Sequence, residues 1–408
     1  MRLLILGGGI SDPWNGLTID SKQYVQLAET MLDTGRYQDL TGEDLDLFRS
    51  PGYPVFLAVI LSITRGSLAA VIVVQVILNL LCAVFLYLIG KSIGSERVGL
   101  VASVVFLLSP NALFWSASIL TETVFAFGLI LAFLWMIKAT DGEFPLWVVG
   151  ILMGALTLIR PIGLYLFILW ALWLLFVKSK RIDFRNRMKS TVIFLLGALL
   201  VVVPWFIRNT VQHDQFTLSS VSDVTIGSYH LALTLVEAEG LQWDEAKVQV
   251  ARMGGGLGAA AEVIRSHPVP FMKVQVNGLA RTMLGTEAET WLFLISIGGY
   301  PDLSMIVGSL LRGELGLNEA LELLSSREAQ VSVLLVAWGF VYSLALFGMV
   351  IVGFIRGIRK SDPKIRAVLV LALITVLYLL IIPGAAGQAR FRVPIEPFLA
   401  LFAGMAFF

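Results

Sequence analysis

The stretch LAAVIVVQVILNLLCAVFLYLI, residues 68–89, carries no charged side chain and is long enough to cross a bilayer, which takes about 20 residues. The same character holds for the whole chain, whose 408 residues are 57% hydrophobic and only 14% charged. Soluble domains carry about 25% charged residues. A chain with so few charges cannot cover its surface with polar groups, so the sequence predicts a polytopic membrane protein in one integral domain, residues 1–408.

Eight further apolar segments accompany residues 68–89 and predict an all-α bundle of roughly 9–11 transmembrane helices. The expected spans are Leu68–Ile89, Val98–Trp115, Ile119–Ile137, Leu146–Ile159, Ile162–Val177, Thr191–Ile207, Val331–Ile355, Ala367–Ile382 and Val393–Phe408. The apolar segment Gly52–Ile63 is too short to span, so we expect an interfacial or re-entrant helix there. A mixed region, residues 208–330, separates the sixth span from the seventh.

Two basic connectors predict the orientation. Residues 178–189 hold six Lys or Arg against one acid, and residues 356–366 hold five against one. Cytoplasmic loops are enriched in Lys and Arg, so both connectors are expected inside, at the plasma (inner) membrane. Counting crossings from them places a first loop, residues 12–67, and the region 208–330 on the non-cytoplasmic side. Residues 1–10 are too short to bring the chain across, so we expect that a first transmembrane helix is missing before them.

The first loop begins with a predicted helix. Apolar residues recur with helical spacing over residues 21–33, and Gly35 is placed to end the helix. This puts Asp20 at or near the N-cap, the position that short acidic and hydroxyl side chains favour. Capping is therefore one explanation for Asp20, and a chemical role is the other.

Charged residues collect on the predicted outer face, in the first loop and at the outer ends of the spans, where arginine is unexpected. They are Asp20, Arg49, Glu122, Arg160, Arg208, Arg390 and Arg392. Guanidinium groups suit phosphate, and a neighbouring carboxylate can deprotonate a hydroxyl or hold a divalent cation, with Asp20 and Glu122 as possible ligands. The duller alternatives are that Glu122 pairs structurally with Arg160, and that Arg208 and Arg390 snorkel to lipid headgroups.

Other polar residues predict no separate chemistry. Gln75 and Asn79, one turn apart in an apolar segment, favour interhelical hydrogen bonds. The three histidines lack the spacing of metal ligands and are expected at the surface, and the single cysteine, Cys82, excludes a disulfide within the chain. No phosphate-binding glycine-rich loop is present, and the net charge of +1 predicts no nucleic-acid partner.

The ordered motifs resemble the GT-C membrane glycosyltransferases, in the branch of the protein mannosyltransferases and the aminoarabinose transferase of lipid A (glycosyltransferase family 39). The resemblance is carried by Asp20-Ser-Lys-Gln-Tyr24, Phe48-Arg49-Ser-Pro51-Gly52-Tyr53-Pro54, Thr121-Glu122, Arg160-Pro161, Pro204-Trp205 with Arg208-Asn209, and Arg390-Phe-Arg392-Val-Pro394 with Glu396-Pro397. Many members have two adjacent acids where this chain has Asp20-Ser21. Little is recognisable in residues 208–330.

The resemblance implies an inverting transfer of a sugar from a polyprenyl-phosphate donor to an acceptor hydroxyl of a lipid, glycan or protein at the outer face. Asp20 would be the general base, and Arg49, Arg160, Arg208, Arg390 and Arg392 would hold the donor phosphate, with Tyr24, Tyr53 and Glu122 in support. Residues 208–330 would face the acceptor. A transporter or flippase of a lipid-linked substrate is the alternative, and it predicts ionisable residues near the bilayer midplane. A third possibility, a membrane scaffold or receptor, leaves the arginines unexplained.

Overall fold

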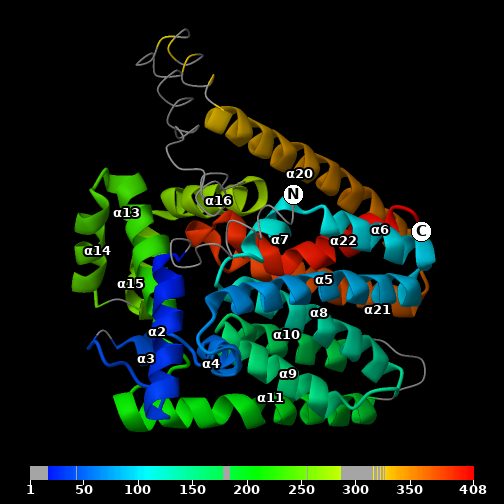
Figure 1. Ribbon diagram of the computed structural model, residues 1–408, viewed down its shortest axis with the longest axis horizontal. Coiled ribbons are helices and arrows are strands. Elements are labelled where there is room, and N and C mark those ends of the chain that lie inside the picture. Colours follow the sequence, from blue (N-terminus) through cyan, green and yellow to red (C-terminus); the bar gives the residue numbers. More distant parts are fainter. Residues whose placement is uncertain are drawn as a thin grey trace.

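The computed structural model of the protein describes residues 17–42, 44–177, 184–254, 256–285 and 327–408, with the single residues 316, 319, 322 and 325. All regular elements in these residues are helices (Figure 1). The longer ones are α2 (Ile19–Thr34), α4 (Gly52–Thr64), α5 (Leu68–Ile93), α6 (Glu96–Leu107), α8 (Thr121–Thr140), α9 (Leu146–Ile159), α10 (Gly163–Phe176), α11 (Phe184–His213), α14 (Trp243–Arg252), α15 (Gly256–Ser266), α16 (Pro268–Leu284), α20 (Arg327–Lys360), α21 (Pro363–Ile381) and α22 (Glu396–Met405). The shorter ones are α3 (Leu45–Phe48), α7 (Pro110–Trp115), α12 (Val221–Val224), the π-helix η1 (Thr225–Leu231), α13 (Ala232–Glu239), and the 3₁₀ helices η2 (Gly384–Ala386) and η3 (Ala389–Ile395).

The predicted fold class, an all-α polytopic membrane protein, is confirmed. Five helices of the described part are long and apolar enough to span a bilayer: α5, α8, α11, α20 and α21. Three shorter apolar helices, α4, α9 and α10, accompany them. The sequence predicted at least nine spans. Within the described residues, fewer helices than that are long enough to span a bilayer alone.

Helix α8 is at the centre of the bundle, since 67% of its spanning window is buried, more than in any other of the five. Its Phe125, Leu129 and Phe133 belong to the large apolar core. Glycines bring neighbouring helices close: a Cβ on Gly154 would lie 2.6 Å from the carbonyl oxygen of Ala198, so α9 and α11 touch backbone to backbone.

The predicted interhelical hydrogen bonds are also present. The Gln75 side chain donates to the carbonyl of Ser118 at 2.6 Å, and Asn79 donates to the carbonyl of Ala112 at 3.1 Å. Both amides are buried, where an unpaired polar group would be costly. Their hydrogen bonds hold α5 to α7 and to the residues that follow it.

Two predicted spans differ from the structure. The segment Val98–Trp115 divides into α6 and α7, because the Ser109 hydroxyl accepts from the Ala112 N–H as an N-cap and Pro110 occupies the first helical position. The segment Val393–Phe408 begins as the 3₁₀ helix η3 and continues as α22, whose ten residues are all buried. Helix α22 packs against α20 and α6 and is too short to span on its own.

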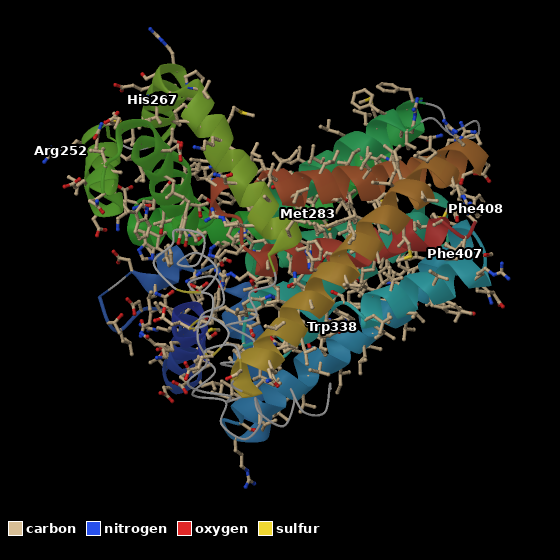
Figure 2. All side chains as sticks on the ribbon, turned by 90° about the horizontal axis from the view of Figure 1, so that it is seen from above. Arg252, His267, Met283, Trp338, Phe407 and Phe408 are labelled. Carbon is tan, nitrogen blue, oxygen red and sulfur yellow. The ribbon has the colours of Figure 1, made fainter. Side chains whose placement is uncertain are left out.

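The described part of the region 208–330 is largely helical. Helices α13, α14 and α15 enclose a small apolar core of their own, which includes Leu235, Ala246 and Val263. Together with α2, α3 and α4 they lie at one end of the bundle, on the left in Figure 1. Figure 2 shows Arg252 and His267 at the outer edge of this group and Met283, near the end of α16, over the middle of the molecule.

One ion pair joins two connectors between helices. Asp141, which follows α8, lies 2.7 Å from Lys364 of the basic connector 356–366. Residues 178–183 of the other basic connector, and residues 286–315 of the region 208–330, lie outside the described residues.

Candidate active site

Asp20 is in the first turn of α2, and it does not cap the helix as the sequence suggested. The N-cap is Thr18, whose side chain accepts a hydrogen bond from the N–H of Ser21. Gly35 ends α2 in the left-handed conformation, as predicted, with φ of 69°. Because Thr18 satisfies the helix end, both carboxylate oxygens of Asp20 are left for partners elsewhere in the chain.

Those partners are two arginines from opposite ends of the sequence. Asp20 Oδ1 lies 2.6 Å from Arg49 Nη2, and Oδ2 lies 2.8 Å from Arg390 Nη1. Burial by itself would raise the pKa of Asp20, but the guanidinium groups of Arg390 and Arg49 outweigh it and hold the pKa below its ordinary value. Asp20 is therefore an anion at neutral pH.

Arg49 is held by its neighbours on α2. The Oε1 atom of Gln23 accepts from both Nε and Nη2 of Arg49, at 2.9 and 2.6 Å, and Nη1 donates to the Tyr24 hydroxyl at 3.3 Å. The Tyr24 ring packs edge-on against that of Tyr53 at 5.0 Å, and Tyr53 donates to Gln75 at 2.7 Å. Tyr24 thus contacts Arg49 directly, and Tyr53 supports it by packing against Tyr24.

Glu122 adds a second carboxylate, in the first turn of α8. Its Oε1 atom lies 2.8 Å from Arg160 Nη1 and 3.9 Å from Arg390 Nε. The Phe391 ring lies beside both cations, 5.5 Å from the Arg160 guanidinium carbon and 5.2 Å from that of Arg390. Arg390 consequently joins the two carboxylates into one cluster, which we call the acid–arginine cluster: Asp20, Arg49, Glu122, Arg160 and Arg390.

The segment that carries Arg390 is fixed from two sides. The Asn111 side chain on α7 donates to the carbonyl of Ala389 at 2.7 Å. On the other side, Gln275 of α16 accepts from the Ala385 N–H at 3.0 Å, and Arg281 donates to the Ala385 carbonyl at 2.7 Å. Arg390 is therefore positioned by α7 and α16 together.

The structure does not bring the other two predicted arginines to Asp20. Arg392 is buried and paired with Glu396, one helical turn on, at 2.7 Å, and it also donates to the Met283 carbonyl. Arg208, near the end of α11, pairs with Asp46 of α3. The sequence offered no signal for this separation, because Arg390 and Arg392 stand in the same short motif.

Sequence reasoning missed three residues of this site and misplaced one histidine. Gln23 and Phe391 stand inside the motifs that carry the resemblance, but they were not expected to take part in the site. Asn111 stands outside every motif, and only its contacts reveal it. His213, expected at the surface, has a side chain only 18% exposed and lies 3.2 Å from the Asp46 carboxylate.

A divalent cation, with Asp20 and Glu122 as possible ligands, stays a prediction. Among the described residues no three His, Cys, Asp or Glu side chains gather, and the nearest partners of Asp20 and Glu122 are guanidinium groups rather than further oxygen donors.

Comparisons with known proteins agree with the resemblance to GT-C glycosyltransferases. Residues 49–207 match the family model described as dolichyl-phosphate-mannose-protein mannosyltransferase, and this range contains Arg49, Glu122 and Arg160. A search of the curated proteins found no match.

The fold is shared with solved structures of the oligosaccharyltransferase of Archaeoglobus fulgidus. The oligosaccharyltransferase of Archaeoglobus fulgidus in the apo form is 15% identical, with a TM-score of 0.52 over 99% of this chain and 49% of its own. The same enzyme in complex with zinc and sulfate is 14% identical, with a TM-score of 0.52 over 99% of this chain and 48% of its own. ArnT from Cupriavidus metallidurans bound to undecaprenyl phosphate is 12% identical, with a TM-score of 0.43 over 100% of this chain and 76% of its own. The chain thus spans about half the length of the oligosaccharyltransferase, and the GT-C-like fold is confirmed.

Proposed function

We propose that this protein is a membrane glycosyltransferase that moves a sugar from a polyprenyl-phosphate-linked donor to an acceptor hydroxyl, with inversion at the sugar carbon. The observation that carries the proposal is the Asp20 carboxylate held between Arg49 and Arg390 at 2.6 and 2.8 Å. An acid placed within reach of phosphate-binding groups is the arrangement that such a transfer requires. The match of residues 49–207 to a family that uses a sugar linked to a lipid phosphate supports the choice of donor.

The charge of the acid–arginine cluster supports an anionic ligand. Three guanidinium groups stand against two carboxylates, so the cluster has a net charge of +1 in a largely buried setting. Buried ion pairs are weak contributors to stability, because desolvation offsets the attraction. Such a group of charges is therefore better explained by a ligand that completes it, and guanidinium groups bind phosphate oxygens in a fork.

Arg49, Arg160 and Arg390 bind the donor phosphate in this proposal, and Asp20 takes the proton of the acceptor hydroxyl. The acceptor oxygen forms a bond to the anomeric carbon on the face opposite the phosphate. The bond between that carbon and the phosphate oxygen breaks, and its electron pair stays on the phosphate. The three guanidinium groups stabilise the polyprenyl phosphate as it leaves.

Asp20 becomes a better base as the donor binds. In the free protein its carboxylate is tied to Arg49 and Arg390, which lowers its basicity. A bound phosphate competes for the same guanidinium groups, and Asp20 then keeps less of their stabilisation. The base is thus activated when there is a donor to react with.

The site faces the non-cytoplasmic side of the plasma (inner) membrane in this proposal. The basic connector at residues 356–366 is joined through Lys364 to Asp141, away from the acid–arginine cluster, and the excess of Lys and Arg favours the cytoplasm for that connector. The described helices of the region 208–330 then stand on the outer side, where an acceptor arrives.

Asp20→Asn tests the proposal. Mass spectrometry of the lipid that co-purifies with wild-type protein should find a polyprenyl phosphate or its sugar derivative. Asp20→Asn should retain this lipid and lose sugar transfer, while Asp141→Asn, which breaks an ion pair at the opposite end of the bundle, should keep both. Full transfer by Asp20→Asn would remove the residue from its role, and lipid-linked transport without transfer would favour a flippase.

A further inference from the structure

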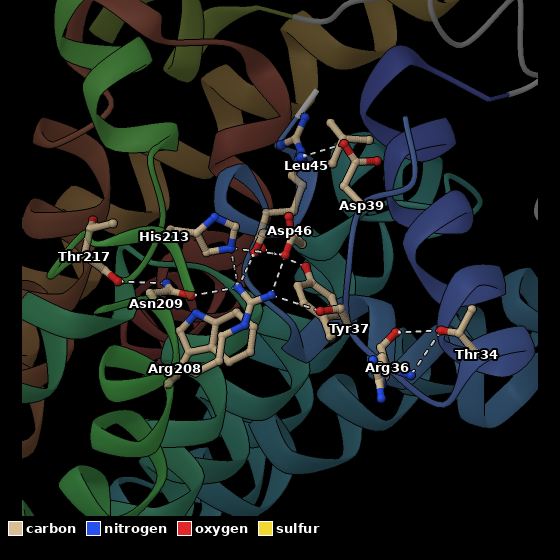
Figure 3. A network of polar contacts seen from close by, with 12 residues as sticks. Thr34, Arg36, Tyr37, Asp39, Leu45, Asp46, Arg208, Asn209, His213 and Thr217 are labelled. Carbon is tan, nitrogen blue, oxygen red and sulfur yellow. Dashed lines mark hydrogen bonds and ion pairs between the residues drawn. The ribbon is translucent and has the colours of Figure 1, made fainter. Parts of the chain in front are cut away.

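A second ion cluster lies beside the acid–arginine cluster and is not used by the proposed chemistry. It consists of Asp46 on α3 with Arg208 and His213 on α11 (Figure 3). The three side chains are only 9%, 15% and 18% exposed. Holding charges in such a setting is costly, so a role for the cluster is expected.

The guanidinium of Arg208 forms hydrogen bonds with other groups of the protein. Its Nη2 atom donates to the carboxylate of Asp46 and to the carbonyl of Tyr37 at 2.9 Å. Its Nη1 atom donates to the Asp46 carbonyl at 3.1 Å and to the side chain of Asn209 at 2.9 Å. The Trp205 ring lies 4.8 Å from the guanidinium carbon. Arg208 therefore binds the first loop at two points of its backbone.

The short helix α3 needs this support. It has four residues, and its N-cap, Asp44, has a φ of 51° and makes no side-chain cap; the Asp39 carboxylate accepts from the Leu45 N–H at 3.4 Å. A single helical turn is unstable alone because it fixes several residues for one or two hydrogen bonds. Contacts with the end of α11 and with the chain that follows therefore help to orient it.

Residues 217–220, which follow α11, also bind α3. The Ser219 hydroxyl donates to the Phe48 carbonyl at 2.5 Å, and the Ser220 N–H donates to the Leu47 carbonyl at 3.2 Å. The Asn209 side chain donates to the carbonyl of Thr217 at 2.8 Å and so fixes this stretch to α11. The carbonyls of Leu47 and Phe48 are therefore bound by residues 219–220, and that of Asp46 by Arg208.

Arg49 is the residue at the end of α3, and the same contacts reach it. It is the C-cap of the helix, with its N–H donating to the Leu45 carbonyl at 2.7 Å. Its own carbonyl accepts from the Tyr37 hydroxyl at 2.7 Å. Tyr37 thus links the two clusters, because its carbonyl binds Arg208 and its hydroxyl binds Arg49.

We propose that Asp46 and Arg208 form a latch that positions Arg49 for the donor phosphate. The latch couples the end of α11 and residues 217–220 to the loop that carries Arg49. Asp46 and Arg208 are positioning residues, and neither touches the donor. This inference rests on the proposed function, in that Arg49 is one of the arginines expected to bind phosphate.

The test measures local opening and lipid affinity separately. Arg208→Met removes the charge and its hydrogen bonds, and Ser219→Ala removes one hydrogen bond to α3 without leaving a buried charge. Lys247→Met is the control, since it breaks an exposed i,i+3 ion pair with Asp244 in the neighbouring helical group. Hydrogen exchange is followed at residues 45–49, and binding is measured with undecaprenyl phosphate in detergent micelles.

We expect faster exchange at residues 45–49 in both variants, with exchange in α5 and α8 unchanged. Undecaprenyl phosphate should bind roughly tenfold more weakly to Arg208→Met, because a charged contact that positions Arg49 is lost. It should bind a few-fold more weakly to Ser219→Ala, because only a neutral hydrogen bond is lost. Lys247→Met should match wild type in both readouts.

Each other result overturns a defined part. Unchanged exchange at residues 45–49 in both variants means that there is no latch, and Ser219→Ala decides this even if Arg208→Met fails to fold. Faster exchange with unchanged lipid affinity means that the latch does not position Arg49, while the proposed function stands. A wild-type protein that does not bind undecaprenyl phosphate removes that lipid phosphate as the ligand, and with it the positioning role.

Discussion

Arg390 Nη1 lies 2.8 Å from Oδ2 of Asp20, although the two residues are 370 positions apart in the chain. The contact joins two distant segments, because α2 lies near the beginning of the described chain and η3 lies near its end. Since Arg49 binds the other oxygen of the same carboxylate, the acid–arginine cluster requires both ends to be in place. The proposed chemistry depends on this contact.

Arg390→Ala should weaken donor binding. The variant removes a charged hydrogen bond to the phosphate, which contributes about 1.5–3 kcal/mol, so the Kd for a polyprenyl phosphate should rise roughly 10- to 100-fold. Arg390→Lys keeps the charge without the planar fork and should recover part of the loss. Titration with undecaprenyl phosphate measures both, with Arg252→Ala, an exposed arginine at the end of α14, as the control. Equal affinity in Arg390→Ala would contradict the assignment.

Glu122→Gln should destabilise the protein more than the loss of one ion pair suggests. The Glu122 side chain is 4% exposed and faces Arg160 and Arg390, so the amide leaves two cations near each other without their shared anion. Breaking a buried pair on one side typically costs about 3–5 kcal/mol. Thermal unfolding in detergent should therefore show a clear drop in Tm. The double variant Glu122→Gln/Arg160→Met should be more stable than Glu122→Gln alone, and a lower Tm in the double variant would argue against the charge explanation.

The acid–arginine cluster was predictable from sequence to the extent that its members stand at the ends of apolar segments. Hydrophobic periodicity locates those ends to within a few residues, and the parity of the two basic connectors assigns Asp20, Arg49, Glu122, Arg160 and Arg390 to one side. Their convergence then follows from the bundle. The resemblance to GT-C glycosyltransferases supplied the roles.

The separation of Arg390 from Arg392 could not be predicted. Both stand in one short motif, and the sequence does not reveal that the segment is a 3₁₀ helix, which turns one side chain to Asp20 and buries the other against Glu396. The position of Arg208 could not be predicted for a similar reason. Its partner Asp46 lies in a polar loop with no periodicity, and ion pairs between distant segments leave no mark in a single sequence.

Gly52→Ala should destabilise the junction of α4 and α9. A Cβ at position 52 would lie 2.6 Å from the backbone of Leu158 and Ile159, just before Arg160, and backbone atoms cannot move aside without shifting the helix. Overpacking of this kind costs roughly 1–3 kcal/mol, so a lower Tm is expected. Gly348→Ala in α20 is the matched control, because nothing lies within 4 Å of its Cβ and alanine favours a helix. If both variants have the Tm of wild type, the close approach at Gly52 is not needed for stability.

The pH dependence of transfer should differ between the free protein and its donor complex. In the free protein, burial pushes the pKa of Asp20 up, but Arg390 and Arg49 hold it below 3.8, its ordinary value. A base must be deprotonated, so a rate falls as the pH drops through the pKa of that base. The profile of kcat/KM reports the free protein, so its acidic limb should lie below the ordinary pKa of an aspartate. The profile of kcat reports the complex, in which the donor phosphate has taken up the guanidinium groups.

The acidic limb of kcat should therefore lie at higher pH than that of kcat/KM, by on the order of one unit, since the loss of one charged hydrogen bond is comparable to the 1.4 kcal/mol that one pKa unit represents. The donor does not confuse this comparison, because a sugar phosphodiester keeps a single negative charge throughout the range. Initial rates of sugar transfer at saturating and at limiting donor give the two profiles. Arg160→Lys is a useful companion, since Arg160 contacts Glu122 rather than Asp20, and its two profiles should remain separated as in wild type. Coincident acidic limbs in the wild-type protein would mean that donor binding does not release Asp20 from Arg49 and Arg390, and the activation of the base by its own substrate would have to be abandoned.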